Sequence, residues 1–187
     1  MAAAETILLE IVTPTGVALK ERVNEVTAPS VAGEFGVLPG HLPLLAALRT
    51  GLVTYRQDGT THQFAVHHGF VEVANDAALL LTEKFSRRED VDVVRVRRRL
   101  KEVDEELDRW QGDLTDPRRR ELIEEEQWLA TQLELIGDPP PPMVREDTRF
   151  LAENAEAPSV DEMVEGQTPD ASLTDHKRPG SPFPEGK

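Results

Sequence analysis

The sequence has no cysteine, more acidic than basic residues, and no apolar run of the roughly 20 residues that a membrane-spanning helix needs. The lack of cysteine excludes a disulfide framework and a Cys-ligated metal site. The formal net charge of −14 argues against nucleic-acid binding, which needs a basic surface. The first residues, MAAAETILLEIV, have no positively charged flank, so we expect no signal peptide. These absences predict a soluble protein of a reducing compartment such as the cytoplasm, without direct membrane insertion.

What the 187 residues do contain is enough apolar side chain, 39% of the composition, to bury a core. Charged residues become denser after Phe85, and most of the 14 prolines follow Gly137. We therefore expect three parts: a β domain over residues 1–85, a helical hairpin over 86–137 and a tail over 138–187. The predicted fold class is α+β, and the β domain is a sandwich or barrel.

Residues 1–85 have the pattern of short strands separated by turns. Apolar, β-branched segments such as TILLEIV, GLVTYRQ and ALLLTEKF recur, and Asp58-Gly59 is a hairpin signal because both residues tolerate positive φ. Turn signals at roughly 8–12 residue intervals favour nine or ten strands in an all-β unit. We expect Leu45 and Leu48 to lie in its core.

Residues 86–137 change to a helical period. One apolar stripe contains Val93, Val96, Leu100, Val103, Leu107, Trp110 and Leu114. Its helix would begin at a Ser86–Glu89 capping box or at Asp90, and Gln111-Gly112-Asp113 would end it. Asp116-Pro117 would start a second helix whose stripe contains Leu122, Leu129, Leu133 and Ile136, and Gly137 would stop it. The short connection predicts an antiparallel pair.

Residues 138–187 are acidic and proline-rich, and have almost no aromatic content. Such a segment cannot bury enough apolar surface to offset about 1–2 kcal/mol of backbone entropy per residue. We expect it to be disordered.

Catalytic motifs are scarce. The sequence has no P-loop, no His-Glu-x-x-His and no Gly-x-Ser-x-Gly. His67 and His68 would point to opposite faces of a strand and so would not share a metal. The basic run Arg95–Lys101 precedes EVDEELD, so it is either a solvated helix face with i,i+4 pairs such as Arg98 with Glu102, or a surface for an acidic partner.

The segment from Gly33 to Pro43 interrupts the strand pattern. Gly33, Gly36 and Gly40 permit unusual backbone geometry, while Pro39 and Pro43 remove hydrogen-bond donors. The segment must therefore be a sheet edge or a loop between strands. A corner between two sheets would explain its glycines and prolines, but not Glu34 and His41, which look presented to a partner.

GEFGVLPGHLPLL, Gly33 to Leu45, resembles the signature Gly-Glu-φ-Gly-φ-x-Pro-Gly-His-x-Pro-φ-φ, where φ is apolar, of the epsilon subunit of F-type ATP synthases (delta in mitochondria). HHGFVEVANDAALLLTEKF is similar to a second stretch of that family. The resemblance covers residues 5–136. It implies a flattened β-sandwich of about ten strands followed by a two-helix hairpin, in a protein that is not itself catalytic and needs no cofactor or metal.

The same resemblance implies a place in the central stalk. The chain would join the gamma subunit to the polar loops of the membrane c-ring during proton-driven ATP synthesis, as a peripheral subunit at the cytoplasmic face of the bacterial inner membrane. By position, Glu34 and His41, with Gly33, Gly36, Pro39 and Gly40, would form the gamma and c-ring interface. In many bacterial members the hairpin also extends along gamma toward the beta subunits and inhibits ATP hydrolysis. In this chain the residues that would make the inhibitory contact with the beta subunits are Arg95, Arg97, Arg98, Arg99 and Arg118–Arg120.

Some members of that family bind ATP through Ile/Leu-Asp-x-x-Arg-Ala. The corresponding residues here run from Val91 to Val96, with Asp92 and Arg95 kept and both flanking apolar positions changed. Glu124–Glu126 lie where positive charge would help to bind a triphosphate.

Two other classes of function stay open on the sequence. One is a free-standing adaptor whose β domain binds an extended peptide at an open sheet edge. The other is a small enzyme that uses Glu34 and His41 as an acid–base pair, although it would lack a nucleophile and an orienting group. Co-isolation with gamma would distinguish a stalk subunit from both.

Overall fold

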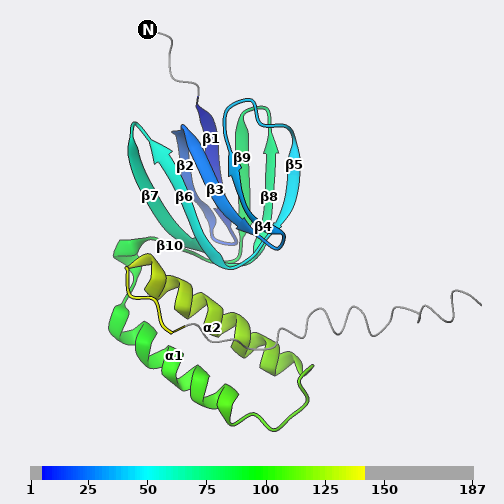
Figure 1. Ribbon diagram of the computed structural model, residues 1–187, viewed down its shortest axis with the longest axis vertical. Coiled ribbons are helices and arrows are strands. Elements are labelled where there is room, and N and C mark those ends of the chain that lie inside the picture. Colours follow the sequence, from blue (N-terminus) through cyan, green and yellow to red (C-terminus); the bar gives the residue numbers. More distant parts are fainter. Residues whose placement is uncertain (1–5, 142–187) are drawn as a thin grey trace, which may run out of the picture. The chain divides into compact units, whose positions relative to one another are not determined.

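The computed structural model describes residues 6–141, which comprise a β-sandwich and two helices within one compact unit (Figure 1). The sandwich has ten strands, as the sequence predicts. They are β1 (Ile7–Thr13), β2 (Gly16–Val23), β3 (Glu25–Ser30), β4 (Gly33–Val37), β5 (Leu44–Leu48), β6 (Gly51–Gln57), β7 (Thr60–Val66), β8 (Gly69–Ala74), β9 (Ala77–Thr82) and β10 (Phe85–Ser86).

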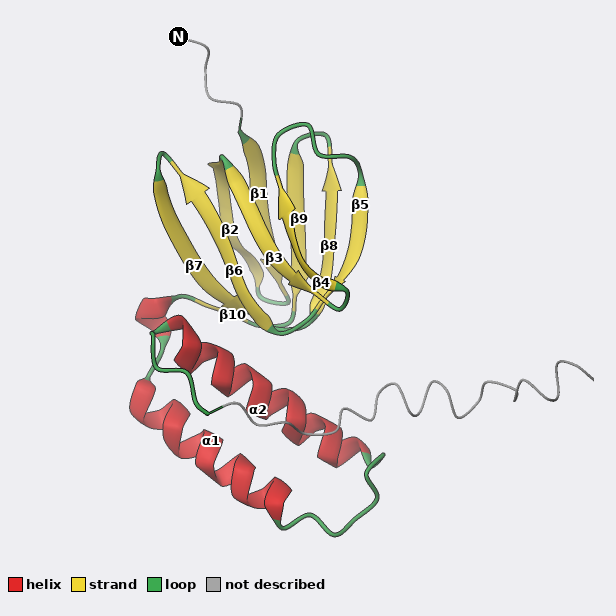
Figure 2. Cartoon of the chain, in the orientation of Figure 1, coloured by secondary structure: helices red, strands yellow, loops and turns green. Residues whose placement is uncertain are grey.

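The strands form one continuous sheet that folds over into two layers (Figure 2). Its order is β10-β7-β6-β3-β5-β8-β9-β1-β2, and β4 pairs with β3 away from this path. Neighbours are antiparallel except β1 and β9, which run parallel. A single residue pair, Ser30 with Leu48, joins β3 to β5 and so connects the layers. We refer to β5-β8-β9-β1-β2 as the first layer and to β10-β7-β6-β3 as the second.

The sandwich core lies between the layers, because every second residue of each strand points inward. The fully enclosed side chains include Ile7, Leu9, Ile11, Val53 and Leu80. Leu48 belongs to this core and is only 2% exposed, which confirms one prediction. Leu45 does not: it is 73% exposed, so its placement in the core was wrong. Leu45 is an odd number of residues from Leu48 and therefore points to the opposite face of β5.

The tight turns include the one that the sequence predicts at Asp58-Gly59. Asp58 and Gly59 have φ of 49° and 81° and connect β6 to β7. Asn75 and Asp76, at 51° and 54°, connect β8 to β9. Positive φ at both central residues matches the twist of antiparallel neighbours, which explains the preference for Asn, Asp and Gly at these positions.

The hairpin consists of α1 (Val93–Asp108) and α2 (Pro117–Leu135). Val96, Leu100, Val103 and Leu107 of α1 pack against Leu122, Ile123, Leu129 and Leu133 of α2 in a core separate from that of the sandwich. Asp116 caps α2 by accepting from the Arg118 backbone N–H at 2.7 Å. Gly137, at φ 85°, follows the end of α2, and the Asp138 N–H donates back to the Leu133 carbonyl at 3.0 Å. The predicted start and stop of the second helix are thus confirmed.

Both ends of α1 differ from the prediction. Asp92 caps its start by accepting from the Arg95 N–H at 3.0 Å, because Arg88–Asp90 form a separate 3-10 turn in which Asp90 accepts from the Arg87 N–H. At its other end α1 stops at Asp108, before Gly112. Trp110 still packs on the hairpin core from the connection, whereas Leu114 is 48% exposed and was wrongly included in the buried stripe.

Helix α2 lies between α1 and the sandwich, and contacts β6 and β7 (Figure 1). Gln132 donates to the Ser86 hydroxyl at 3.4 Å, and Arg88 donates to the Ile136 carbonyl at 3.3 Å. Among the described residues, neither helix is long and apolar enough to cross a membrane. The tail that was predicted to be disordered comprises residues 138–187, of which 142–187 lie outside the described residues.

Candidate functional site

The signature segment begins as a strand at the sheet edge. Gly33–Val37 form β4, and Glu34 lies opposite Pro29 of β3, so the edge alternative is correct for this half. The Ser30 hydroxyl closes the β3–β4 turn by donating to the Gly33 carbonyl at 2.6 Å. The remainder, from Leu38 to Pro43, is a loop leading into β5.

The loop that carries His41 is fixed through its backbone. The Gly40 N–H donates to Asp76 Oδ1 at 2.7 Å, and this carboxylate belongs to the β8–β9 turn. The His41 N–H donates to the Leu38 carbonyl at 3.1 Å. Gly40 adopts φ of 77°, which other residues resist, so a glycine is needed for this turn. His41 Nδ1 lies 2.7 Å from the Leu42 carbonyl, a contact with its chain neighbour.

The structure does not bring Glu34 and His41 together. Glu34 lines a groove of about 630 Å³ that also includes Arg49, Glu126 and Pro140. His41 follows the other end of β4, beside the β8–β9 turn. Three strand residues at roughly 3.3 Å each already put about 10 Å between Glu34 and the start of the loop. An acid–base pair needs hydrogen-bond reach, so this geometry gives the enzyme alternative no support.

The outer face of the first layer carries a continuous apolar row. Its members lie directly opposite one another on neighbouring strands: Ala47 faces Phe70, Phe70 faces Leu81, Leu81 faces Val12, and Val12 faces Val17. Phe70, Leu81 and Val17 are 57%, 45% and 59% exposed, and Leu45 lies one row away. We call this surface, Leu45 with Ala47, Phe70, Leu81, Val12 and Val17, the apolar row. Exposed apolar surface of this extent marks an interaction site.

The outer face of the second layer is polar by contrast. Gln63 donates to the Thr54 hydroxyl at 3.2 Å, and Arg56 pairs with Glu25 at 2.6 Å. We did not predict the apolar row from the sequence, although FVEVA, Phe70 to Ala74, contains a pattern that indicates it. Alternation with Val71 and Val73 inward leaves Phe70 on the outer face, where a solvated strand would carry a polar residue.

The hairpin arginines differ in how far they are already paired. Arg99 makes a two-pronged ion pair with Glu125, at 2.6 and 2.7 Å. The hydrogen bond from Arg99 lowers the pKa of the Glu125 carboxyl. Arg97 Nε donates to Asp138 at 2.9 Å. The predicted pair of Arg98 with Glu102 is present but loose, at 3.9 Å, and Arg98 is 74% exposed. Arg95 is exposed and makes no ion pair with another described residue.

The degenerate ATP pattern lies at the start of α1. Asp92 serves as the helix cap, and a pocket of about 270 Å³ there is lined by Asp90, Asp92, Arg95, Arg99 and Glu125, among others. Three carboxylates and a neutralised Arg99 disfavour a triphosphate. Nucleotide binding at Asp92 and Arg95 stays an untested prediction.

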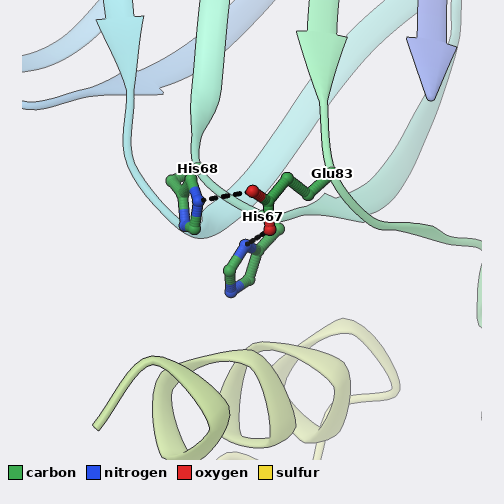
Figure 3. Close-up of side chains that lie close together, drawn as sticks. All are labelled: His67, His68 and Glu83. Atoms are coloured by element: carbon green, nitrogen blue, oxygen red, sulfur yellow. Dashed lines mark ion pairs between the residues drawn. The ribbon is translucent and has the colours of Figure 1, made fainter. Parts of the chain in front are cut away.

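His67 and His68 form a cluster with Glu83, contrary to the prediction that they point apart (Figure 3). His68 Nε2 lies 3.2 Å from one Glu83 oxygen, and His67 Nδ1 lies 3.7 Å from the other. Strand alternation does not apply, because β7 ends at Val66 and β8 begins at Gly69. Burial lowers the pKa of His67 to about 4, so its imidazole is neutral at pH 7.

Comparisons with known proteins agree with this architecture. Residues 6–88 match the family model described as "ATP synthase, Delta/Epsilon chain, beta-sandwich domain". The chain is 41% identical over 104 residues to an ATP synthase epsilon chain of Citrifermentans bemidjiense. The aligned region covers 56% of this chain and 75% of that one. It is 43% identical over 107 residues to an ATP synthase epsilon chain of Nitratidesulfovibrio vulgaris, covering 54% and 80%.

A solved structure shares the fold. A chain in the Euglena gracilis mitochondrial ATP synthase, OSCP/F1/c-ring in rotational state 1, superposes with a TM-score of 0.58 at 22% identity and covers 71% of this chain and 81% of that one. The β-sandwich is that of the ATP synthase delta/epsilon class, since residues 6–88 match the family model. The chain belongs to the ATP synthase epsilon chain family, which confirms the resemblance.

Proposed function

We propose that this chain is the epsilon-type subunit of a bacterial ATP synthase central stalk, and that the apolar row is the surface by which it binds the gamma subunit. The observation that carries the proposal is the asymmetry of the sandwich. One outer face carries an apolar row across all five strands of its layer, and the other is polar. A contiguous exposed apolar surface of that kind marks a site where a partner binds.

The gamma subunit is the partner for two reasons. Family membership makes a subunit of the same enzyme the expected partner, and gamma is the central-stalk subunit that the family resemblance assigns to this chain. The apolar row is also flat, as a strand surface is, and therefore suits a broad, permanent contact between subunits rather than a small-molecule site. Catalysis belongs to other subunits in this proposal, and the chain acts at the peripheral, cytoplasmic face of the membrane.

Glu34 and His41 have separate roles in the proposal because they lie at different ends of β4. His41 and its loop contact one neighbouring subunit, and the β3–β4 turn with Gly33 and Glu34 contacts another; gamma and the polar loops of the c-ring are the two candidates. Val31, which is 68% exposed in that turn, adds an apolar tip to it. Gly36, Pro39 and Gly40 shape the segment between the two contacts.

The test is binding of the full-length chain to purified gamma from the same organism. Phe70→Asp places a charge in the middle of the apolar row and should weaken binding at least tenfold, about 1.4 kcal/mol. Thr61→Asp puts the same charge on the exposed polar face of the second layer and should leave binding unchanged. Equal binding by both variants would overturn the assignment of the row, and absence of binding by the wild type would overturn the stalk proposal itself.

A further inference from the structure

We propose that His67, His68 and Glu83 form a binding site for a divalent transition-metal cation of the Zn²⁺ type, at the junction between the sandwich and α2 (Figure 3). Each residue offers one ligand atom, and these atoms all lie within 4.8 Å of one another. The family's central-stalk role does not require this site, so the inference is independent of the proposed function.

The two His–Glu83 distances are close to those between ligands of a metal site, and the widest separation within the cluster, up to 4.8 Å, would have to shorten. Zn²⁺ binds nitrogen and oxygen ligands at about 2.0–2.2 Å, so two ligands of a tetrahedral site lie about 3.4 Å apart. His68 Nε2 and His67 Nδ1 lie 3.2 Å and 3.7 Å from the two Glu83 oxygens. Small side-chain rotations would bring all three onto one ion. A water would complete the coordination.

The buried histidine is an independent sign of a ligand. His67 is 2% exposed, yet neither ring nitrogen makes a hydrogen bond of ordinary geometry with any described residue. Buried polar atoms without partners are uncommon in folded proteins because they lose their hydration without gaining a hydrogen bond. On the helix side, the Glu124 backbone of α2 also acts on the ring. A metal on Nδ1 would satisfy one nitrogen and strengthen the other as a donor toward that backbone.

The backbone around the cluster is built to hold these residues together. Residues 67–68 and 83–84 lie where the chain passes between layers, since β8 pairs with β9 and β7 pairs with β10. The Thr82 hydroxyl lies within hydrogen-bond distance of the His67, His68 and Lys84 carbonyls, at 2.9, 3.4 and 3.1 Å. The His67 N–H donates to the Lys84 carbonyl at 3.0 Å.

Gly69 permits the close approach next to the histidines. A Cβ at this position would lie 1.9 Å from the Leu81 carbonyl oxygen, so a side chain would push β8 and β9 apart. The rigid backbone places the three ligands before any ion binds, which lowers the entropic cost of binding.

The position of the site connects it to the hairpin. The His67 ring packs edge-on against Trp128 of α2, with centroids 5.8 Å apart. Lys84 also lies over the Trp128 ring, with its Nζ 6.0 Å from the ring centroid. Occupancy of the site would therefore alter the environment of Trp128 and the docking of α2 on the sandwich.

The test uses the full-length chain, purified without a histidine tag and freed of metal by a chelator. Calorimetric titration with Zn²⁺ should show one ion per chain, with a dissociation constant on the order of micromolar. Co²⁺ should give the visible absorption of a tetrahedral site, and Trp128 fluorescence should change with the same stoichiometry. Zn²⁺ should also raise the melting temperature, because it binds the folded state.

The deciding variants are His68→Ala and Glu83→Gln, since both side chains are partly exposed and their loss leaves the core intact. Each should weaken Zn²⁺ affinity at least about tenfold and remove the Co²⁺ bands. His62→Ala removes an exposed imidazole of β7 outside the cluster and should bind as the wild type does. The proposal is overturned if the wild type binds no stoichiometric Zn²⁺, which would make the cluster an ordinary ion pair, or if His68→Ala binds as tightly as the wild type.

Discussion

His41 shows how a residue can be fixed in place without contributing much to stability. Its loop is held by backbone groups of Leu38 and Gly40, the latter bonded to Asp76, while the ring's one hydrogen bond among the described residues is with the neighbouring Leu42 carbonyl. The position is therefore determined by the backbone, and the side chain is left for a partner. Presentation of this kind is typical of functional loops on a rigid scaffold.

His41→Ala should accordingly weaken assembly with the other subunits and leave the isolated chain stable. We expect the melting temperature of the free chain to fall by no more than about 2 °C, since a surface substitution rarely costs more than about 0.5 kcal/mol. Incorporation into the purified enzyme should fall several-fold. A large loss of thermal stability with normal incorporation would assign His41 a structural role instead.

His67 predicts a pH dependence of stability in the metal-free chain. Its pKa is about 4 in the folded protein and about 6.5 in the unfolded chain, so between these values the unfolded state binds more protons. The contribution of neutral His67 to the free energy of unfolding is fully present above about pH 6.5. It is lost as pH falls toward 4, by up to roughly 3 kcal/mol. The charged or titratable groups nearest the ring are His68, Lys84 and Glu83, with the Glu124 backbone on the helix side.

Urea unfolding with a chelator present, at pH 7 and pH 5, would measure this dependence. Carboxylates also titrate in the range, so the comparison is with His67→Gln, which cannot take up the proton. The variant should lose less stability than the wild type over the same interval. Identical losses would show that His67 titrates normally in the folded state.

At the scale of the elements, the alternating residues of strand β5 have two roles: one set packs in the core and the other faces outward toward a partner. Leu48 faces the core and Leu45 faces outward, three positions away. An apolar sequence such as LLAAL has no alternation by which to choose its inner face, so register with β8 decides it.

Leu48→Asp should unfold the sandwich, because an unpaired buried charge costs several kcal/mol. Leu45→Asp should leave the chain folded, with a change in unfolding free energy under about 1 kcal/mol, and should reduce gamma binding. Circular dichroism during thermal denaturation, paired with the gamma-binding assay, distinguishes them. Unfolding by both substitutions would indicate that the outer face is covered within the chain.

At the scale of the whole molecule, the hairpin and the sandwich have separate hydrophobic cores joined through α2. At this junction the His67 ring packs against Trp128. Gln132 donates a hydrogen bond to Ser86 and Arg88 donates one to Ile136, both of them long, at 3.4 and 3.3 Å. Such a junction can open at a cost of a few kcal/mol, a range in which a partner shifts the populations. The proposed inhibitory role of the hairpin depends on this opening.

Truncation after Arg88 should therefore preserve assembly and raise ATP hydrolysis by the purified enzyme if the hairpin acts as a brake. Arg95→Glu with Arg98→Glu should release part of the brake, because Arg95 is exposed without an ion pair to another described residue and Arg98 is exposed and only loosely paired. Arg99 is left unchanged in that variant, since its ion pair with Glu125 joins the helices. High salt should weaken the wild-type brake by screening. Unchanged hydrolysis in the truncated enzyme would make the hairpin a structural cap only.

The sequence by itself determined the features that depend on local order along the chain. The turns at Asp58-Gly59 and Asn75-Asp76, the Asp116-Pro117 helix start and the Gly137 stop are each specified by the conformations their own residues permit. The Gly33–Leu45 signature likewise identified the family, because its spacing is itself a local property.

Only the tertiary structure decided which residues meet. Leu45 turned outward because β8 sets the register of β5, and Phe70, Leu81 and Val17 became one surface because five strands align them. His67 and His68 joined Glu83 because the chain crosses between layers there, where the alternation of a regular strand no longer holds. Pairing between distant segments is fixed by the free energy of the whole packed core, and a linear pattern carries that information only in part.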